Sequence, residues 1–149
     1  MTLTILRLLA VLLTAVAMAA GFAHLLELPN KISLEREEYL TVQQLYRGWA
    51  LLGFVVVGAL VITGIVALMV RARTTEFYLT LVAALCIALS LAIFFLFTYP
   101  ANQQTQNWTI LPDNWERLRR QWEYSHAVAA ILYFVALSAL TLSLQVSHD

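Results

Sequence analysis

The segment GWALLGFVVVGALVITGIVALMV, from Gly48 to Val70, decides the fold of this chain. It contains no charged residue and exceeds the roughly 20 apolar residues that a helix needs to cross the hydrocarbon core of a bilayer. Three other segments have the same character: Leu8–Leu26, Phe77–Tyr99 and Ala127–Val146. The sequence therefore predicts four transmembrane helices.

The composition agrees with this prediction. Hydrophobic residues make up 61% of the chain and charged residues only 12%, whereas soluble domains are nearer half apolar and a quarter charged. The four spans leave no room for a separate soluble domain, so we expect one all-α, membrane-embedded four-helix bundle over residues 1–149. A net charge of zero gives no reason to expect a nucleic-acid partner. The expected partner is the lipid bilayer.

The first span imitates a secretory signal peptide, because Arg7 precedes an apolar run that includes Ala17-Met18-Ala19. The apolar run continues past Ala19 to Leu26, however, which is longer than such a peptide requires. We therefore expect a retained helix, in an integral multi-pass protein of a bacterial inner (plasma) membrane. The sequence leaves the oligomeric state open, a homo-oligomer included.

Four spans place both termini on one side of the membrane. We call this the plain side, because its charged or imidazole side chains are only Arg7, Arg71, Arg73, Glu76, His148 and Asp149. The opposite, rich side carries Pro29–Arg47 and Pro100–Tyr124. Basic residues are more numerous on the rich side, but several can be committed to carboxylates, so the positive-inside rule leaves the orientation open.

Local signals predict where the helices end. Pro29 and Pro100 are expected to stop the first and third helices. The acidic residues after Ser33 predict a new helix that runs through Tyr39–Trp49 into the second span. Pro112-Asp113-Asn114 predicts another helix start that leads into the fourth span. Helices 2 and 4 would then extend beyond the bilayer, and the similar order of signals in both halves suggests two parallel helical hairpins.

Two mirrored spacings give the sharpest functional signal. His24 and Glu27 end the first helix, and Glu123 and His126 begin the fourth. Residues three apart share a helix face. Because the two helices run in opposite directions, the reversed order places both histidines at one depth and both glutamates about a turn nearer the rich-side loops.

Imidazole and carboxylate groups are ligands for zinc, iron and copper, so His24, Glu27, Glu123 and His126 form a candidate site for a transition metal. The same four residues can instead serve as acid and base. A b-type haem held by His24 and His126 is a further alternative. In the plainest interpretation, the four side chains meet water or separate arginines, although ionisable residues at a membrane boundary tend to be functional.

Several short segments of the chain resemble the anthrone oxygenase-like family of small four-helix membrane proteins, most of them of unknown function. The segments are His24-Leu25-Leu26-Glu27-Leu28-Pro29-Asn30-Lys31, Tyr46-Arg47-Gly48-Trp49, Pro100-Ala101-Asn102, Asn107-Trp108 and Trp122-Glu123-Tyr124-Ser125-His126. The named members insert oxygen into polyketide anthrones to give anthraquinones and were long treated as cofactor-independent. The resemblance implies that His24, Asn102, Trp108 and His126 belong to the site.

These observations predict a membrane oxidoreductase, a metal-dependent enzyme of the oxygenase type that acts on a lipophilic or aromatic small molecule. Beside the four candidate ligands, we expect seven residues to line the site or support it: Asn30, Tyr46, Arg47, Asn102, Trp108, Arg119 and Trp122. The rival is a non-enzymatic membrane protein, such as a small transporter or an assembly subunit. A polar conduit is poorly supported, because the span interiors offer only small hydroxyls that more often serve helix packing.

Overall fold

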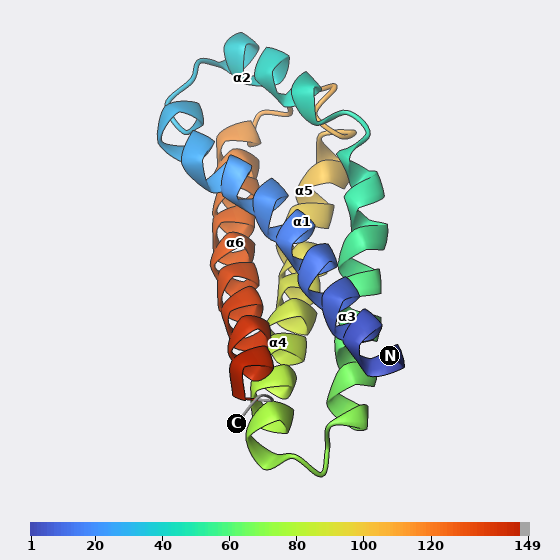
Figure 1. Cartoon of the computed structure of the whole chain (residues 1–149). Helices are drawn as coiled ribbons and strands as arrows, with labels where there is room; N and C mark the ends of the chain where they lie inside the picture. The colour runs from blue at the N-terminus through green and yellow to red at the C-terminus, as the bar shows by residue number, and fades with distance from the viewer. Residues whose placement is uncertain (147–149) are drawn as a thin grey trace.

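A computed structural model describes residues 1–146, all of whose regular elements are helical (Figure 1). His148 and Asp149, which we assigned to the plain side, lie outside these residues. The elements are α1 (Thr2–Lys31), α2 (Arg36–Gln43), η1 (Gln44–Tyr46), η2 (Trp49–Leu51), α3 (Leu52–Met69), α4 (Thr74–Ile93), η3 (Phe94–Thr98), α5 (Tyr99–Gln104) and α6 (Trp115–Val146).

Four helical stretches are long and apolar enough to cross a membrane, which confirms the predicted all-α four-helix bundle. They are Thr2–Lys31, Trp49–Met69, Thr74–Gln104 and Trp115–Val146. Each of α1 and α4 packs against both α3 and α6, so consecutive spans are antiparallel neighbours in a closed ring. The chain is an integral multi-pass membrane protein by the length and composition of these helices.

Small side chains fill the centre of the bundle and let the helices approach closely. The core residues include Ala10, Ala59, Ala83 and Ala136, each at most 1% exposed. The closest approach of α1 to α6 is at Gly21, where an added Cβ would lie 3.1 Å from the Cα atom of Ala130. This crossing lies about one helical turn from each of the two candidate histidines.

Pro29 does not stop the first helix, contrary to the sequence prediction. Helix α1 continues to Lys31, and the N–H of Ile32 still donates to the carbonyl of Leu28 at 3.0 Å. A proline so close to the end of a helix removes only one backbone bond, and the next residues keep theirs. As a consequence, Lys31 lies four residues after Glu27 on the same helix.

Pro100 does not stop the third helix either. The chain widens into a π-helical turn, η3, in which the N–H of Tyr99 donates to the carbonyl of Phe94, and it then continues as α5. The wider turn accommodates the proline ring, and Gln121 of α6 donates to the carbonyl of Phe97 at 2.8 Å. Because the helix continues to Gln104, it carries Asn102 over the end of the bundle.

The predicted continuous helix from the rich-side segment into the second span is also wrong. Helix α2 ends at Gln43, and Gly48 takes a left-handed conformation with φ +89°, which glycine adopts at little cost. The chain therefore turns, and α2 lies across the end of the bundle instead of projecting from it (Figure 1). Helix α6, by contrast, runs without a break over Trp115–Val146, as predicted.

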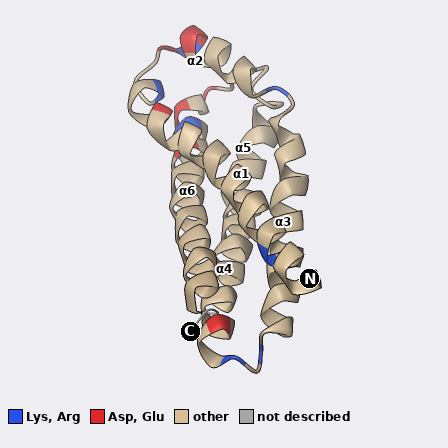
Figure 2. Cartoon of the chain, in the orientation of Figure 1, with Lys and Arg blue, Asp and Glu red and all other residues tan. Residues whose placement is uncertain are grey.

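Charged residues gather at the two ends of the bundle (Figure 2). We call the end under α2 the capped end and the opposite end the plain end. At the plain end, Glu76 is 6% exposed and accepts hydrogen bonds from the guanidinium groups of Arg7 and Arg73. This ion pair joins the first helix to the start of α4.

Candidate functional site at the capped end

Two imidazole rings face each other between α1 and α6. The ring centroids of His24 and His126 are 4.3 Å apart, and the planes are tilted by 31°. His24 is buried and His126 half-buried. The close crossing at Gly21 and Ala130, one turn away, explains why the two helices hold the rings so near each other.

Aromatic rings enclose the imidazole pair. The indole of Trp122 lies 4.9 Å from the ring of His24 and 4.3 Å from that of His126, both edge-on. On its other side, His24 contacts the rings of Tyr46 and Trp49 at 4.5 and 5.4 Å. Tyr46 and Trp49 flank the turn at Gly48, and Trp49 is 37% exposed. This turn therefore covers the outer side of the imidazole pair.

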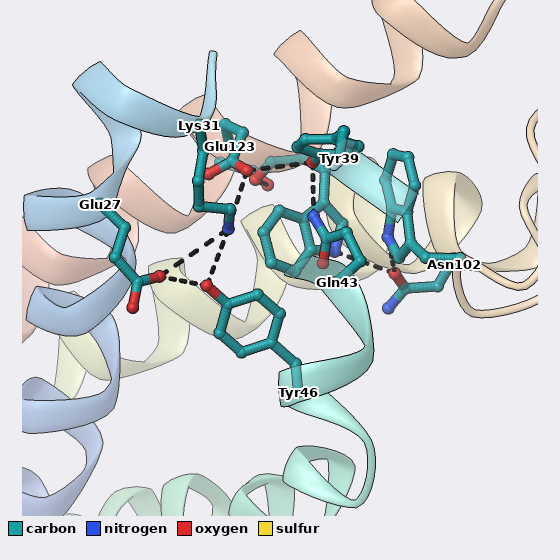
Figure 3. A network of polar contacts seen from close by, with 10 residues as sticks. Glu27, Lys31, Tyr39, Gln43, Tyr46, Asn102 and Glu123 are labelled. Carbon is teal, nitrogen blue, oxygen red and sulfur yellow. Dashed lines mark hydrogen bonds and ion pairs between the residues drawn. The ribbon is translucent and has the colours of Figure 1, made fainter. Parts of the chain in front are cut away.

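A buried ammonium group holds the two candidate carboxylates (Figure 3). The Nζ atom of Lys31 lies 2.9 Å from Oε1 of Glu123 and 3.9 Å from Oε2 of Glu27. It also donates to the phenol oxygen of Tyr46 at 2.9 Å, and that phenol donates in turn to Glu27. The rings of Tyr46 and Trp122 lie 4.3 and 4.8 Å from the same Nζ atom, so aromatic faces add to its stabilisation.

Helix α2, which lies across the capped end, contributes two more polar groups to the cluster. The phenol of Tyr39 donates to Oε1 of Glu123 at 3.0 Å, and the amide of Gln43 donates to the phenol oxygen of Tyr39. Burial and the neighbouring Glu123 carboxylate raise the pKa of Tyr39 above its ordinary value. Burial and the hydrogen bond to Glu27 likewise raise the pKa of Tyr46. Both phenols therefore stay protonated over the physiological range and act as donors.

Asn102 fixes the tryptophans. Its Oδ1 atom accepts from the indole N–H groups of Trp108 at 3.1 Å and Trp122 at 2.9 Å. Trp108 ends a run of three residues with positive φ, from Gln106 to Trp108, a conformation that costs non-glycine residues about 1 kcal/mol or more each. Gln44 helps to hold this loop by donating to the carbonyl of Trp108 at 2.7 Å. Asn102 thus connects the loop to the indole that contacts both imidazoles.

Three buried acceptor-type atoms of the cluster have no hydrogen-bond partner in the described part of the chain. They are Nδ1 of His24, Oε1 of Gln43 and Oε2 of Glu123. A buried polar atom without a partner costs about 1–3 kcal/mol. The hydrogen bonds within the cluster therefore do not use all of its capacity, and groups remain to bind a ligand or exchange a proton.

The predicted four-residue metal site does not form in this arrangement. Among residues 1–146, no three His, Cys, Asp or Glu side chains are grouped so that they could hold a metal ion. The ammonium of Lys31 lies between the two carboxylates, where a metal cation would have to lie. Haem does not fit between the imidazoles either, since rings that bind one iron from opposite sides have centroids about 6 Å apart, given metal–nitrogen bonds of about 2 Å.

The structure separates the predicted site residues into two groups. It brings together His24, Glu27, Tyr46, Asn102, Trp108, Trp122, Glu123 and His126. Asn30 is exposed and lies outside the cluster, and exposed Arg47 bonds to the side chain of Gln44. Arg119 lies in the next layer of the cap, where it donates to the carbonyl of Leu34 at 2.6 Å and stacks on Trp115.

Sequence reasoning missed Lys31, Tyr39 and Gln43. A signal for Lys31 was present, because it is the only lysine of the chain and follows Glu27 at the i,i+4 spacing. The expectation that the helix stops at Pro29 hid this relation. Tyr39 and Gln43 have the same spacing on α2, but nothing in the sequence shows that α2 lies over the bundle end.

Comparisons with known proteins gave no match among family models, curated proteins or solved structures. The resemblance to the anthrone oxygenase-like family therefore stays a prediction.

Proposed function

We propose that this chain is a membrane oxidoreductase of the oxygenase type, and that its active site is the imidazole pair together with the Lys31–Glu123 network. The observation that carries the proposal is the convergence of two imidazoles, a lysine, two carboxylates and two phenols at one end of the bundle. Packing alone does not require these groups, because in many proteins apolar residues of similar volume replace a buried ion pair without loss of stability. A bacterial inner membrane, with both termini on one side, is part of the proposal.

The surroundings favour a lipophilic, aromatic substrate. Flat rings of Tyr46, Trp49 and Trp122 surround His24, and the indole of Trp49, which is 37% exposed, can stack on a substrate ring. The turn that covers His24 also carries exposed apolar side chains, among them Leu45, which is 72% exposed, and Leu51, which is 69% exposed. A substrate dissolved in the bilayer would meet this turn first.

The reaction that we propose converts an activated methylene group and O2 into a ketone and water. Two C–H bonds break, one C=O bond forms, and the second oxygen atom leaves as water with both hydrogens; the four electrons lost by carbon reduce O2. A neutral imidazole accepts the first proton from carbon. The ammonium of Lys31 and the phenol of Tyr46 stabilise the negative charge that develops on the substrate oxygen.

A metal would not bind through all four predicted ligands unless Lys31 left its place between the carboxylates. Iron, copper or zinc remains a prediction for the cofactor, and elemental analysis of the freshly purified protein tests it. The roles proposed for the imidazoles, Lys31 and Tyr46 involve no metal.

Oxygen uptake with a hydroxylated anthrone as probe tests the proposal. The purified full chain in detergent should consume one O2 per ketone formed, faster than the uncatalysed reaction. His24→Ala should lower the rate about 10²-fold or more, as loss of a general base does. The double variant Arg71→Ala/Arg73→Ala, at the plain end, should retain the wild-type rate of oxygen uptake. Equal rates for the wild type and His24→Ala would contradict the proposal and favour a non-enzymatic role.

The rival function of a polar conduit would need polar groups free along the spans, and of the buried hydroxyls only those of Thr14 and Thr63 have no partner among the described residues. The buried hydroxyls of Thr80, Ser90 and Ser143 bond to carbonyls of their own helices. Such hydroxyls stabilise helices and their packing.

A further inference from the structure

Lys31 is unusual in its position. Lys31 is the only lysine of the chain, it is 3% exposed, and it lies at the capped end of the first span. Lysines near helix ends in membranes normally extend toward water. Here the side chain points into the cluster between Glu27 and Glu123 (Figure 3).

Hydrogen bonds connect an exposed carboxylate with a buried one through this lysine. The side chain of Glu27 is 43% exposed and that of Glu123 is 0% exposed. Between them, the phenol of Tyr46 donates to Glu27 and accepts from Lys31, whose Nζ atom lies 2.9 Å from Glu123. Each neighbouring pair in this series is within hydrogen-bond distance.

Each member of this chain can both accept and release a proton, since carboxylates, phenols and amines all do so. The inner end is open, because Oε2 of Glu123 has no partner among the described residues. Glu123 precedes His126 by one helical turn, and Trp122 beside it contacts both imidazoles. The route therefore ends one helical turn from His126 on the same helix.

We propose that Glu27, Tyr46, Lys31 and Glu123 form a proton route between water at the capped end and the buried imidazole pair. Along the hydrogen bonds as they stand, Lys31 passes a proton to the Tyr46 oxygen as Tyr46 passes its own proton to the Glu27 carboxylate, and the neutral Lys31 amine then takes a proton from protonated Glu123. The net change is one proton from the Glu123 carboxyl to the Glu27 carboxylate, with no electron transferred. The purpose assigned to the route rests on the proposed function, but its existence does not.

A purely structural ion pair would have different requirements. In a static pair the Tyr46 hydroxyl would only accept from Lys31, so removing that hydroxyl would free one N–H of Nζ and would not slow its exchange with water. Arginine in place of lysine would preserve it, whereas a guanidinium cannot release a proton in a protein. The variants Tyr46→Phe and Lys31→Arg therefore distinguish a relay from a static pair.

The single lysine makes the test direct. The full chain is labelled with ¹⁵N-lysine in lipid nanodiscs, so that one Nζ signal reports the exchange of its protons with water without any substrate. Tyr46→Phe and Glu27→Gln should each slow this exchange about tenfold. Tyr124→Phe, which removes an exposed phenol of α6, should not change it. Unchanged exchange in both Tyr46→Phe and Glu27→Gln overturns the route.

Turnover of the anthrone probe gives a second, separate readout. Lys31→Arg keeps the positive charge but cannot release a proton, so it should lower the rate about tenfold while the helices stay folded. If the wild type shows no turnover but the exchange effects appear, the proposed function fails and the route stands. If the wild type turns over the probe but exchange is unchanged or faster in both Tyr46→Phe and Glu27→Gln, the route is overturned and the oxygenase proposal stays in place.

Discussion

Each end of the bundle contains a buried carboxylate paired with a basic side chain. The two ends differ in whether both oxygens of that carboxylate have hydrogen-bond partners. At the plain end, both oxygens of Glu76 accept hydrogen bonds, from Arg7 and Arg73. At the capped end, Oε1 of Glu123 accepts from two donors while Oε2 has no partner in the described part of the chain. In the first pair both carboxylate oxygens are bonded, although Nε of Arg7 beside them has no partner among the described residues. In the second pair a carboxylate oxygen itself remains without a donor.

The comparison shows that a buried charge alone does not identify a functional site. Glu76 is nearly as buried as the residues of the cluster, but among residues 1–146 the ion pairs of its carboxylate are with Arg7 and Arg73. Glu123 belongs to a network that includes phenols and lies beside two imidazoles. We therefore assign a structural role to the plain end and the chemistry to the capped end.

The largest expected effect separates the two ends by activity. His24→Ala and His126→Ala should each reduce turnover of the anthrone probe about 10²- to 10⁴-fold, because each removes a candidate acid–base group. Oxygen uptake per folded protein measures the effect. The double variant Arg71→Ala/Arg73→Ala provides the control, and a comparable loss there would show that the site is misplaced.

The next effect concerns stability. Lys31→Met should lower the free energy of unfolding by about 3–5 kcal/mol, because it leaves Glu123 buried without its cation. Arg73, whose side chain is 56% exposed, provides the comparison at the plain end. Arg73→Ala should cost about 1 kcal/mol or less. Denaturant titration in mixed micelles measures both, and equal costs would contradict the distinction between the ends.

A smaller effect tests how the imidazoles are brought together. Gly21→Ala introduces a Cβ that would lie 3.1 Å from the backbone of Ala130, so α1 and α6 must separate, at a cost of about 1–3 kcal/mol. Gly64→Ala meets nothing within 4 Å and should be neutral or slightly stabilising. Thermal unfolding measures the difference. A stabilised Gly21→Ala would show that the crossing is not tight.

The smallest effect is a pH dependence. Because the pKa values of Tyr39 and Tyr46 are raised in the folded protein, the folded state binds more protons than the unfolded state above about pH 10, the ordinary tyrosine pKa. Stability should thus be unaffected by these groups below pH 10 and fall as the pH rises beyond it. Tyr46→Phe should reduce this fall.

Much of the fold was predictable because hydrophobic length is a strong signal. The four spans and the unbroken α6 follow from apolar stretches and a helix start near Asn114. The errors have local causes. Pro29 and Pro100 were expected to end helices, but one lies too near the helix end to matter and a π turn absorbs the other. The left-handed Gly48 was not recognised as a break.

The candidate site was predicted in part. The mirrored spacing placed His24 opposite His126 because two antiparallel helices reverse both order and direction. It did not place Lys31 between the glutamates, since that depends on the helix continuing past Pro29. The contributions of Tyr39 and Gln43 depend on how α2 lies over the bundle, which is a tertiary contact without a local sequence signal.

Turnover in a matched pair of carboxylate variants tests the central claim most directly. Glu123→Gln and Glu76→Gln make the same chemical change in a buried carboxylate at opposite ends of the bundle. Oxygen uptake with the anthrone probe is measured for each and divided by the amount of folded protein. We predict that Glu123→Gln loses about tenfold or more of the rate and that Glu76→Gln keeps the wild-type rate. Equal rates in the two variants, or a greater loss in Glu76→Gln, would contradict the assignment of the chemistry to the capped end.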